Sequence, residues 1–327
     1  MGKNQSEISF CTFFDSNYYA HGLTMIHSLL KVDRQAVIYV VAMDNNCYNS
    51  LNEISNTRIK VFSIKGIEDH YPNLKITKSI RTKVEYYYSA KGFICHYILS
   101  KSDDIKSITY LDSDLFFFSN PKPIFDELNG ASIGITKHNF HWLCLHQKKY
   151  GLFNAGWITF KKDLKGIKCL EDWMNDCVNW CYGYLEGEKY ADQKYLNAWP
   201  KKYSGVRIIN TKGANVALWN IKNYKISIKE TNIFINKSPL IFYHFASLKQ
   251  LDKNIFSTSL SSVLVSCKGL LRDKIYIPYL KEFLNNQNQH SLSTSKKETH
   301  SKGFITFIRD ASRKVRSYFL NDIIKID

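Results

Sequence analysis

The stretch Tyr110-Leu111-Asp112-Ser113-Asp114-Leu115-Phe116-Phe117-Phe118 joins two apolar runs through a pair of carboxylates one residue apart. Alternate side chains of an extended chain point the same way, so Asp112 and Asp114 can be aimed at one point. Two carboxylates at the end of a buried strand suit a divalent ion that bridges phosphate groups. The stretch therefore predicts a metal site and a phosphorylated ligand.

The residues before this stretch predict an α/β fold. Apolar runs over 8–14 and 36–42 are typical of buried strands, and helical spacing of apolar residues over 18–30 predicts a helix between them. A short helix over 48–54 and a third strand over 58–64 are expected to follow. This alternation predicts a mostly parallel sheet with helices on both faces. Such sheets bind ligands beyond the carboxyl ends of their strands.

The later part of the chain continues the alternation, with one long polar and aromatic segment that is expected to form a functional loop. The sequence predicts strands over 107–111, 131–136 and 157–160, helices over 80–99, 121–128, 163–181 and 189–199, and the loop over 139–152.

The composition favours a folded protein with anionic partners. Of the 327 residues, 44% are hydrophobic and 14% aromatic, which can fill a sizeable core and excludes disorder throughout. The net charge of +16 favours nucleotides, nucleic acid or an anionic membrane surface. No nucleic-acid-binding signature is present, which argues against nucleic acid as a partner. The eight cysteines are scattered among apolar residues, as expected for reduced thiols in a cytoplasmic core.

A change in composition after residue 284 predicts three parts. We expect a catalytic domain over 1–284, a polar linker over 285–303 and a basic amphipathic helix within 304–327. The apolar stripe and basic side chains of residues 304–320 suit either an anionic membrane surface or packing on the main domain or on a partner protein. No stretch reaches the roughly 18–20 apolar residues of a membrane span. The expected location is therefore the cytoplasm, with peripheral association at the inner membrane face.

Short motifs along residues 8–250 resemble, in the same order, those of one enzyme family. They are Phe10-Cys11-Thr12-Phe13-Phe14-Asp15 with Tyr18, Tyr86-Tyr87-Tyr88, Tyr110-Leu111-Asp112-Ser113-Asp114, Phe153-Asn154-Ala155-Gly156, Asp192-Gln193-Lys194-Tyr195-Leu196-Asn197, Asn215-Val216-Ala217-Leu218-Trp219-Asn220 and Tyr243-His244-Phe245. The chain is similar to nucleotide-sugar glycosyltransferases of the GT-A fold, and most similar to bacterial nucleotide-diphospho-sugar transferases related to the glycogenin-like retaining enzymes. The resemblance implies a GT-A domain with the C-terminal helix as an appendage. It also implies transfer of a hexose from a nucleoside-diphosphate sugar, such as a UDP-sugar, to a glycan or lipid-linked acceptor in surface polysaccharide synthesis.

The resemblance implies that Asp112, Asp114 and His244 hold Mn²⁺ or Mg²⁺. A metal there neutralises charge on the leaving nucleoside diphosphate. A nitrogen ligand beside carboxylates favours Mn²⁺ over Ca²⁺. The chain departs from the family in having His244-Phe-Ala-Ser-Leu-Lys249 where the glycogenin-like enzymes have His-x-x-Gly-x-x-Lys-Pro. A structural histidine is the alternative role for His244.

Substrate contacts are also implied by the resemblance. Asp192 and Gln193 match the catalytic pair near the anomeric carbon, where a carboxylate and an amide can bind hydroxyls and stabilise positive charge. Acceptor contacts are implied for Asn215, Trp219 and Asn220. Nucleotide-sugar contacts are implied for Thr12, Phe13, Asp15, Tyr18, Arg81, Lys91, Asp112, Ser113, Asn154 and Lys249.

Structural roles remain open for several of these residues. Asp15 is also placed to cap a helix. Trp219 is equally suited to the core. Arg81 and Lys91, taken singly, suit a solvated helix face.

Two other functions remain open. Phosphohydrolases that use an Asp-x-Asp motif also place two acids after a strand, but they have it at the first strand and need Thr or Val where this chain has Phe116. A non-catalytic, transferase-like protein could bind nucleotide or glycan, although the intact acidic motif and Asp192 argue against decay. The Asp192-Gln193 pair and the order of the motifs favour retention over inversion at the anomeric carbon.

Overall fold

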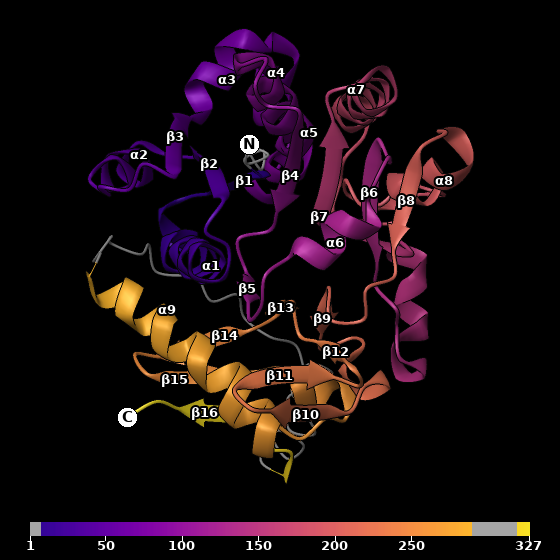
Figure 1. The fold of residues 1–327 in the computed structure, drawn as a ribbon. Coiled ribbons are helices and arrows are strands. Elements are labelled where there is room, and N and C mark those ends of the chain that lie inside the picture. The colour runs from indigo at the N-terminus through magenta and orange to yellow at the C-terminus, as the bar shows by residue number, and fades with distance from the viewer. Residues whose placement is uncertain (1–7, 290–318) are drawn as a thin grey trace, which may run out of the picture.

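A seven-stranded sheet forms the centre of the computed structural model, which describes residues 8–289 and 319–327 (Figure 1). The strand order is β3-β2-β1-β4-β7-β6-β8, and β7 is the one strand of this sheet that runs antiparallel to its neighbours. The predicted, mostly parallel sheet is therefore confirmed. Its strands are β1 Ile8–Phe14, β2 Ala36–Ala42, β3 Ile59–Ser63, β4 Ser107–Leu111, β6 Ile133–Lys137, β7 Phe153–Lys161 and β8 Val206–Ile209.

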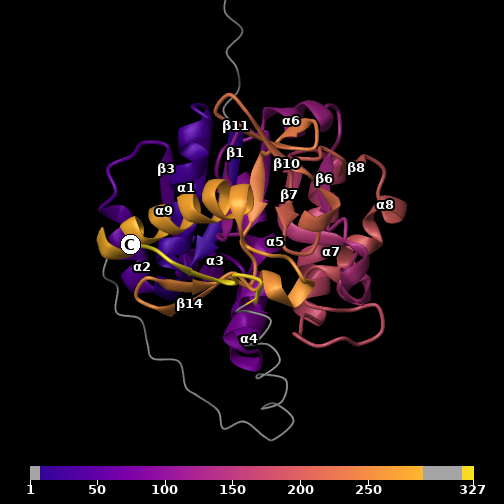
Figure 2. The same cartoon turned by 90° about the horizontal axis from the view of Figure 1, so that it is seen from below.

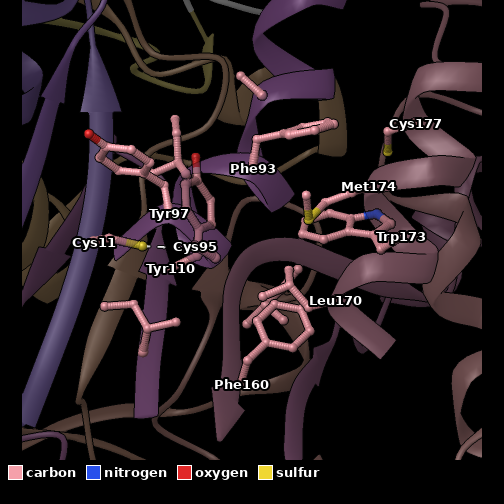
Figure 3. Packing of buried hydrophobic residues seen from close by; sticks show 14 of the residues in the cluster. Cys11, Phe93, Cys95, Tyr97, Tyr110, Phe160, Leu170, Trp173, Met174 and Cys177 are labelled. Carbon is pink, nitrogen blue, oxygen red and sulfur yellow. Dashed lines mark hydrogen bonds between the residues drawn. The ribbon is translucent and has the colours of Figure 1, made fainter. Parts of the chain in front are cut away.

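Helices cover both faces of this sheet, because its strands are apolar on both sides. The helices are α1 Tyr19–Val32, α2 Asn45–Asn52, α3 Ile64–His70, α4 Pro72–Ile80, α5 Lys83–Lys101, α6 Lys122–Glu127, α7 Leu164–Asn179, α8 Trp199–Lys202 and α9 Ile277–Gln289. One apolar cluster joins the sheet to α3, α4, α5 and α7, and a second joins the other face to α1, α2 and α6. Figure 3 shows part of the first cluster, in which Trp173 of α7 packs on Phe160 of β7 with ring centroids 6.0 Å apart, and Phe93 of α5 belongs to the same cluster.

Smaller sheets lie below the main sheet in Figure 1. Their strands are β5 Leu115–Phe117, β9 Val216–Ala217, β10 Ile226–Lys229, β11 Asn232–Ile235, β12 Ser238–Pro239, β13 Phe242–His244, β14 Lys249–Asp252, β15 Ile255–Ser257 and β16 Ile323–Lys325. The sheet β5-β13-β9 matters most for function, because it carries the segment after Asp114 against the segment that ends at His244.

Short 3₁₀ and π segments complete the described elements. They are η1 Ser16–Tyr18, η2 Trp142–Tyr150, η3 Lys194–Asn197, η4 Ile221–Asn223, η5 Leu260–Val263 and η6 Leu271–Tyr276. Much of the predicted functional loop over 139–152 thus forms η2. The helix predicted over 189–199 is wrong, since the chain there forms only η3 before α8. A continuous α-helix cannot form there, because the backbone of Ala191 is left-handed, with φ of 46°.

The helix predicted over 80–99 begins later than expected. A capping box starts α5, in which Thr82 accepts a hydrogen bond from the Glu85 amide and Glu85 accepts one from the Thr82 amide. Residues 64–80 form α3 and α4, two helices that the sequence analysis did not predict.

The C-terminal part differs from the prediction at both of its described ends. Helix α9 continues to Gln289, five residues into the predicted linker, and Asn286 within it is buried and donates to Thr24 of α1 at 3.0 Å. Residues 323–325 form strand β16 instead of a helix, and β16 pairs with β15 beside α9 (Figure 2). The rest of the predicted linker and most of the predicted amphipathic helix, residues 290–318, lie outside the described residues.

A buried carboxylate holds the C-terminal strand in place. Asp322 accepts hydrogen bonds from the hydroxyls of Ser257 and Thr258 and from the amide of Ser261. The strand thus belongs to the main domain. Among the helices of the described ranges, none combines the length and apolar character needed to cross a membrane.

Candidate active site

Three ligand groups converge beyond the carboxyl end of β4. One ligand atom each from Asp112, Asp114 and His244 lie within 4.8 Å of one another. The Nε2 atom of His244 lies 3.0 Å from Asp114 Oδ1 and 3.9 Å from Asp112 Oδ2. Two carboxylate oxygens and an imidazole nitrogen at these separations fit a divalent metal. The three residues predicted as ligands are therefore brought together.

Backbone pairing fixes this arrangement. His244 pairs with Leu115 in the ladder between β13 and β5, and the amide of Phe245 donates to the carbonyl of Asp114 at 2.9 Å. The amide of Asp112 donates to the carbonyl of Gly156 on β7 at 3.0 Å. Each acid is thus held by a strand that is distant in sequence.

The electrostatics of the pair favour a charged contact. Burial alone would raise the pKa of Asp114, but the charge and hydrogen bond of His244 outweigh burial and lower it. Burial would lower the pKa of His244, and Asp114 reverses this and raises it. The raised pKa of His244 and the lowered pKa of Asp114 favour an imidazolium beside a carboxylate, and a divalent cation bound here would displace that proton.

A buried lysine links the two acidic regions of the site. The Nζ atom of Lys91 on α5 lies 3.1 Å from Asp112 Oδ1 and 3.1 Å from Asp192 Oδ2. The Tyr110 hydroxyl also donates to Asp112 Oδ1, at 2.8 Å. Oδ1 of Asp112 is therefore engaged by two donors, while Oδ2 faces His244. The alternative of a solvated helix face is wrong for Lys91, whose side chain is 7% exposed.

Gln193 joins the acidic region to strand β7. Its Oε1 accepts from the Ala155 amide at 3.3 Å and from the Asn154 side chain at 3.4 Å. Its Nε2 donates to the carbonyl of Tyr150 at 3.3 Å. Asn154 in turn accepts from the Gly156 amide at 3.0 Å. Asp192, Gln193 and Asn154 therefore lie together beside the ligand cluster.

The predicted nucleoside side of the site lies at the end of β1. Asp15 caps η1 by accepting from the amides of Asn17 and Tyr18, so its helix-cap role is confirmed. It also accepts from Tyr87 at 3.1 Å and pairs with Lys83 at 2.5 Å. Tyr18 is 51% exposed, which leaves a flat ring face accessible to a base.

Three other residues of the same predicted set make no side-chain hydrogen bond among the residues that the structure describes. Thr12 is fully buried, and its hydroxyl has no hydrogen-bond partner among the described residues. Phe13 packs in the core against Tyr87 and Tyr110. Ser113 is half-buried between the two acids.

Arg81 and Lys249 are not joined to the ligand cluster by any contact of the described residues. Arg81 is buried and donates to the carbonyls of Cys177 and Val178 at 2.6 Å, so it secures the end of α7. A solvated face is wrong for Arg81 as well. Lys249 is exposed in β14 and pairs across the ladder with Ser257.

The residues predicted to bind acceptor are buried. Asn220 donates to the carbonyls of His138 and Asn215 and accepts from the Ala217 amide, which occupies its whole amide group. The Asn215 side chain donates to the Lys137 carbonyl at 3.1 Å. Trp219 is 7% exposed and packs edge-on against His244. These side chains shape the wall behind the metal ligands, and the structure presents none of them as an open acceptor contact.

The sequence analysis missed the close approach at Gly156. A Cβ atom there would lie 2.8 Å from Asp112 Oδ2 and 2.9 Å from Cε1 of His244, distances that real Cβ contacts do not reach. It would also lie 2.7 Å from Asn154 Oδ1. Only a glycine lets β7 pass this close to the ligands.

Gly156→Ala is therefore expected to displace the metal ligands. We expect Mn²⁺ affinity to fall by roughly tenfold or more, because ligand orientation controls metal affinity. Calorimetric titration with Mn²⁺ measures it. Gly66→Ala on α3 is the matched control, since its added Cβ would meet only the Tyr97 hydroxyl, at 3.6 Å. Equal Mn²⁺ affinity in the two variants would contradict the geometry.

Comparisons with known proteins agree with this architecture. No protein-family model matches the chain. Over 255 residues it is 32% identical to the uncharacterized protein YfnD of Bacillus subtilis (strain 168), covering 77% of this chain and 81% of that protein. It is 28% identical to the uncharacterized protein YfnF of the same strain over 254 residues, covering 75% and 83%.

Solved glycosyltransferases share the fold. Galactosyltransferase LgtC, in complex with donor and acceptor sugar analogs, aligns with a TM-score of 0.50 at 16% identity, over 89% of this chain and 98% of LgtC. The glycosyltransferase GlyE of Streptococcus pneumoniae TIGR4 aligns with a TM-score of 0.51 at 15% identity, over 90% of this chain and 66% of GlyE. The predicted GT-A glycosyltransferase fold is thus confirmed.

Proposed function

Since the chain belongs to the family of YfnD of Bacillus subtilis and has the GT-A glycosyltransferase fold, we propose that it is a metal-dependent glycosyltransferase. Its donor is a nucleoside-diphosphate sugar and its acceptor a saccharide. The observation that carries this proposal is the convergence of Asp112, Asp114 and His244 at the carboxyl edge of the sheet. That edge is where open α/β sheets bind their ligands.

The ligand groups fit Mn²⁺ or Mg²⁺, and the imidazole favours Mn²⁺. Such an ion supplies positive charge opposite the leaving diphosphate. The protein's own part is to hold the ligands in place. Tyr110 and Lys91 orient Asp112 through its Oδ1 atom, and the β5-β13 ladder aligns His244 with Asp114.

The donor extends from the end of β1 to Asp192 in this proposal. Tyr18 stacks on the base, and Asp15 binds the ribose while its second role as a cap keeps it fixed. We assign a UDP-sugar as the donor. Lys91, a buried cation between the half-buried Asp112 and the buried Asp192, contacts the phosphate or sugar of the donor.

Transfer at the anomeric carbon involves Asp192 and Gln193. The acceptor hydroxyl forms the new C–O bond while the bond from the anomeric carbon to the diphosphate breaks. The nucleoside diphosphate leaves with the electron pair, and the hydroxyl proton passes to one of its phosphate oxygens. Asp192 and Gln193 bind donor hydroxyls and stabilise the oxocarbenium-like charge. We propose hexosyl transfer with retention of anomeric configuration.

The biological setting is also part of the proposal. We propose surface polysaccharide synthesis in the cytoplasm, with a glycan or lipid-linked acceptor. Residues 304–320 would rest on an anionic membrane surface, because their sequence is basic and amphipathic. The catalytic domain extends at least through α9 to Gln289.

A screen of nucleotide sugars tests the function. Purified full-length protein is incubated with UDP-, GDP- and TDP-sugars, with Mn²⁺, with Mg²⁺ or with EDTA, and released nucleoside diphosphate is measured. We expect release from one donor, dependent on the metal. If no donor releases its nucleoside diphosphate, and calorimetry shows UDP binding of equal affinity with and without metal, the protein is instead a non-catalytic binding protein.

A further inference from the structure

Two half-buried tyrosines, Tyr150 and Tyr190, pack together beside the proposed catalytic pair, and a third, Tyr88, is close enough to Asp192 and Tyr190 for their charges to affect its pKa. Tyr88 belongs to α5, Tyr150 ends η2, and Tyr190 lies two residues before Asp192. The rings of Tyr150 and Tyr190 have centroids 4.6 Å apart and planes inclined by 49°. No polar group of the ligand cluster needs these rings for its own support, so their convergence calls for another explanation.

The backbone of the tyrosine pair is tied to Gln193. Gln193 Nε2 donates to the carbonyl of Tyr150 at 3.3 Å, and the next residue, Gly151, has φ of 134°. A Cβ at Gly151 would lie 3.3 Å from the Gln193 side chain, so a glycine is needed for this approach. On the other side, the carbonyl of Tyr190 accepts from the Lys194 amide at 3.2 Å. The two rings are thus held at a fixed place relative to Gln193.

The hydroxyls of Tyr88 and Tyr190 remain hydrogen-bond donors at neutral pH, because their pKa values are raised. Burial and the negative charge of Asp192 raise the pKa of Tyr88 to about 12. Burial, followed by Tyr150 and Asp192, raises the pKa of Tyr190. Aromatic rings that keep their phenol protons offer both an apolar face and a polar edge. A pyranose ring has the complementary chemistry, with C–H groups on its faces and hydroxyls at its rim.

The side chains that the sequence suggested as acceptor contacts are buried or fully hydrogen-bonded, so other residues have to bind the acceptor. The amide of Asn220 is fully used by the backbone, and Trp219 is buried behind His244. An acceptor hydroxyl must nevertheless come within bonding distance of an anomeric carbon beside Asp192. The partly exposed tyrosines are the groups of the described site that border Asp192 and Gln193 and still offer accessible surface.

We propose that Tyr88, Tyr150 and Tyr190 form the acceptor subsite, and that it takes a pyranose of an oligosaccharide or glycoside. The sugar packs on the pair of Tyr150 and Tyr190, and Tyr88 donates to one of its hydroxyls. This assignment rests on the proposed glycosyltransferase function and names the residues that select the acceptor in it.

Two measurements on the full chain test the subsite. The first is saturation-transfer NMR with methyl hexopyranosides in the presence of UDP and Mn²⁺, which needs no turnover. We expect signals from the ring protons of one glycoside, and their loss in the double variant Tyr150→Ala/Tyr190→Ala. The single variant Tyr150→Phe keeps the stacking surface and should retain binding. Tyr184→Ala is the matched control, because Tyr184 is in the same loop but is 54% exposed and stacks on Tyr182.

The second measurement uses the donor found in the nucleotide-sugar screen. Nucleoside diphosphate release is measured with water alone and with the glycoside that gave the NMR signal. In the double variant we expect the kcat/KM for the glycoside to fall at least about tenfold more than release with water, the loss that an aromatic stacking contact of about 1.4 kcal/mol would cause.

The outcomes separate the two proposals. Loss of glycoside binding without any turnover in the wild type would keep the subsite and overturn the transferase. An equal fall of both rates in the double variant, or unchanged glycoside binding, would overturn the subsite and leave the transferase standing. Absence of any glycoside signal from the wild type would also overturn the subsite.

Discussion

Asp114→Asn is expected to abolish metal-dependent release of nucleoside diphosphate, with a loss on the order of at least 100-fold. The amide that replaces the carboxylate has no charge, so the site loses one of its two anionic ligands. His244 also loses the carboxylate that raises its pKa, since Asp114 Oδ1 lies 3.0 Å from His244 Nε2. Mn²⁺ affinity, measured by titration calorimetry or electron paramagnetic resonance, should fall together with the rate.

A matched control separates this effect from a general loss of charge. Asp126→Asn on α6 removes an exposed carboxylate that pairs with Lys122 at 2.6 Å and is not one of the three metal ligands. It should leave both the Mn²⁺ affinity and the rate unchanged. Wild-type activity in Asp114→Asn would be incompatible with the proposed mechanism, and so would a loss of activity with intact Mn²⁺ binding.

Lys91→Met has the largest expected effect on stability. Its ammonium group is buried between Asp112 and Asp192, and the substitution removes that cation while the acids remain. Breaking a buried ion pair by deleting one partner costs about 3–5 kcal/mol. Urea unfolding at pH 7 measures the free energy of unfolding. Lys168→Met is the control, because Lys168 pairs with Asp172 at an exposed position on α7, where solvent screens the pair and its loss should change stability little.

The stability loss of Lys91→Met should depend on pH in a defined direction. Burial raises the pKa of Asp192 even against the charge of Lys91, and removal of Lys91 raises it further. The folded variant then binds a proton at Asp192 more tightly than the unfolded chain, in which an aspartate has a pKa of about 3.9. Protonation at low pH therefore favours the folded variant. The deficit relative to the wild type should be smallest near pH 4 and should increase as the pH rises to 7; a constant deficit would disprove this explanation.

The sequence predicted the central sheet well where strands are buried on both faces. The bounds of β1 and β2 agree with the apolar runs over 8–14 and 36–42. A parallel strand with helices on both faces is apolar along its whole length, so the ends of the apolar run mark the ends of the strand. The sequence prediction failed where local backbone geometry sets the ends of an element. The capping box at Thr82 and the left-handed Ala191 set element boundaries that hydrophobic periodicity does not reveal.

In the site, the metal ligands were predicted from the sequence, but the strand pairing and the buried lysine that position them were not. The pair Asp112 and Asp114 is visible as a motif, whereas the register that places His244 opposite Leu115 joins segments more than 100 residues apart. The role of Lys91 as a buried bridge depends on the packing of α5, and no local pattern marks it. For Asn220 the sequence prediction was misleading. Its motif suggested a contact with the acceptor, but its side-chain amide forms hydrogen bonds with backbone groups.

The pairing of β16 with β15 shows that the chain returns to the main domain after the basic C-terminal segment. Helix α9 is held on α1 by Asn286, and Asp322 is held by Ser257 and Thr258, so the chain on either side of residues 290–318 is anchored in the main domain. A truncation before residue 290 would therefore remove β16, which pairs with β15, together with the basic segment. A test of the segment alone has to exchange residues 290–318 and keep β16.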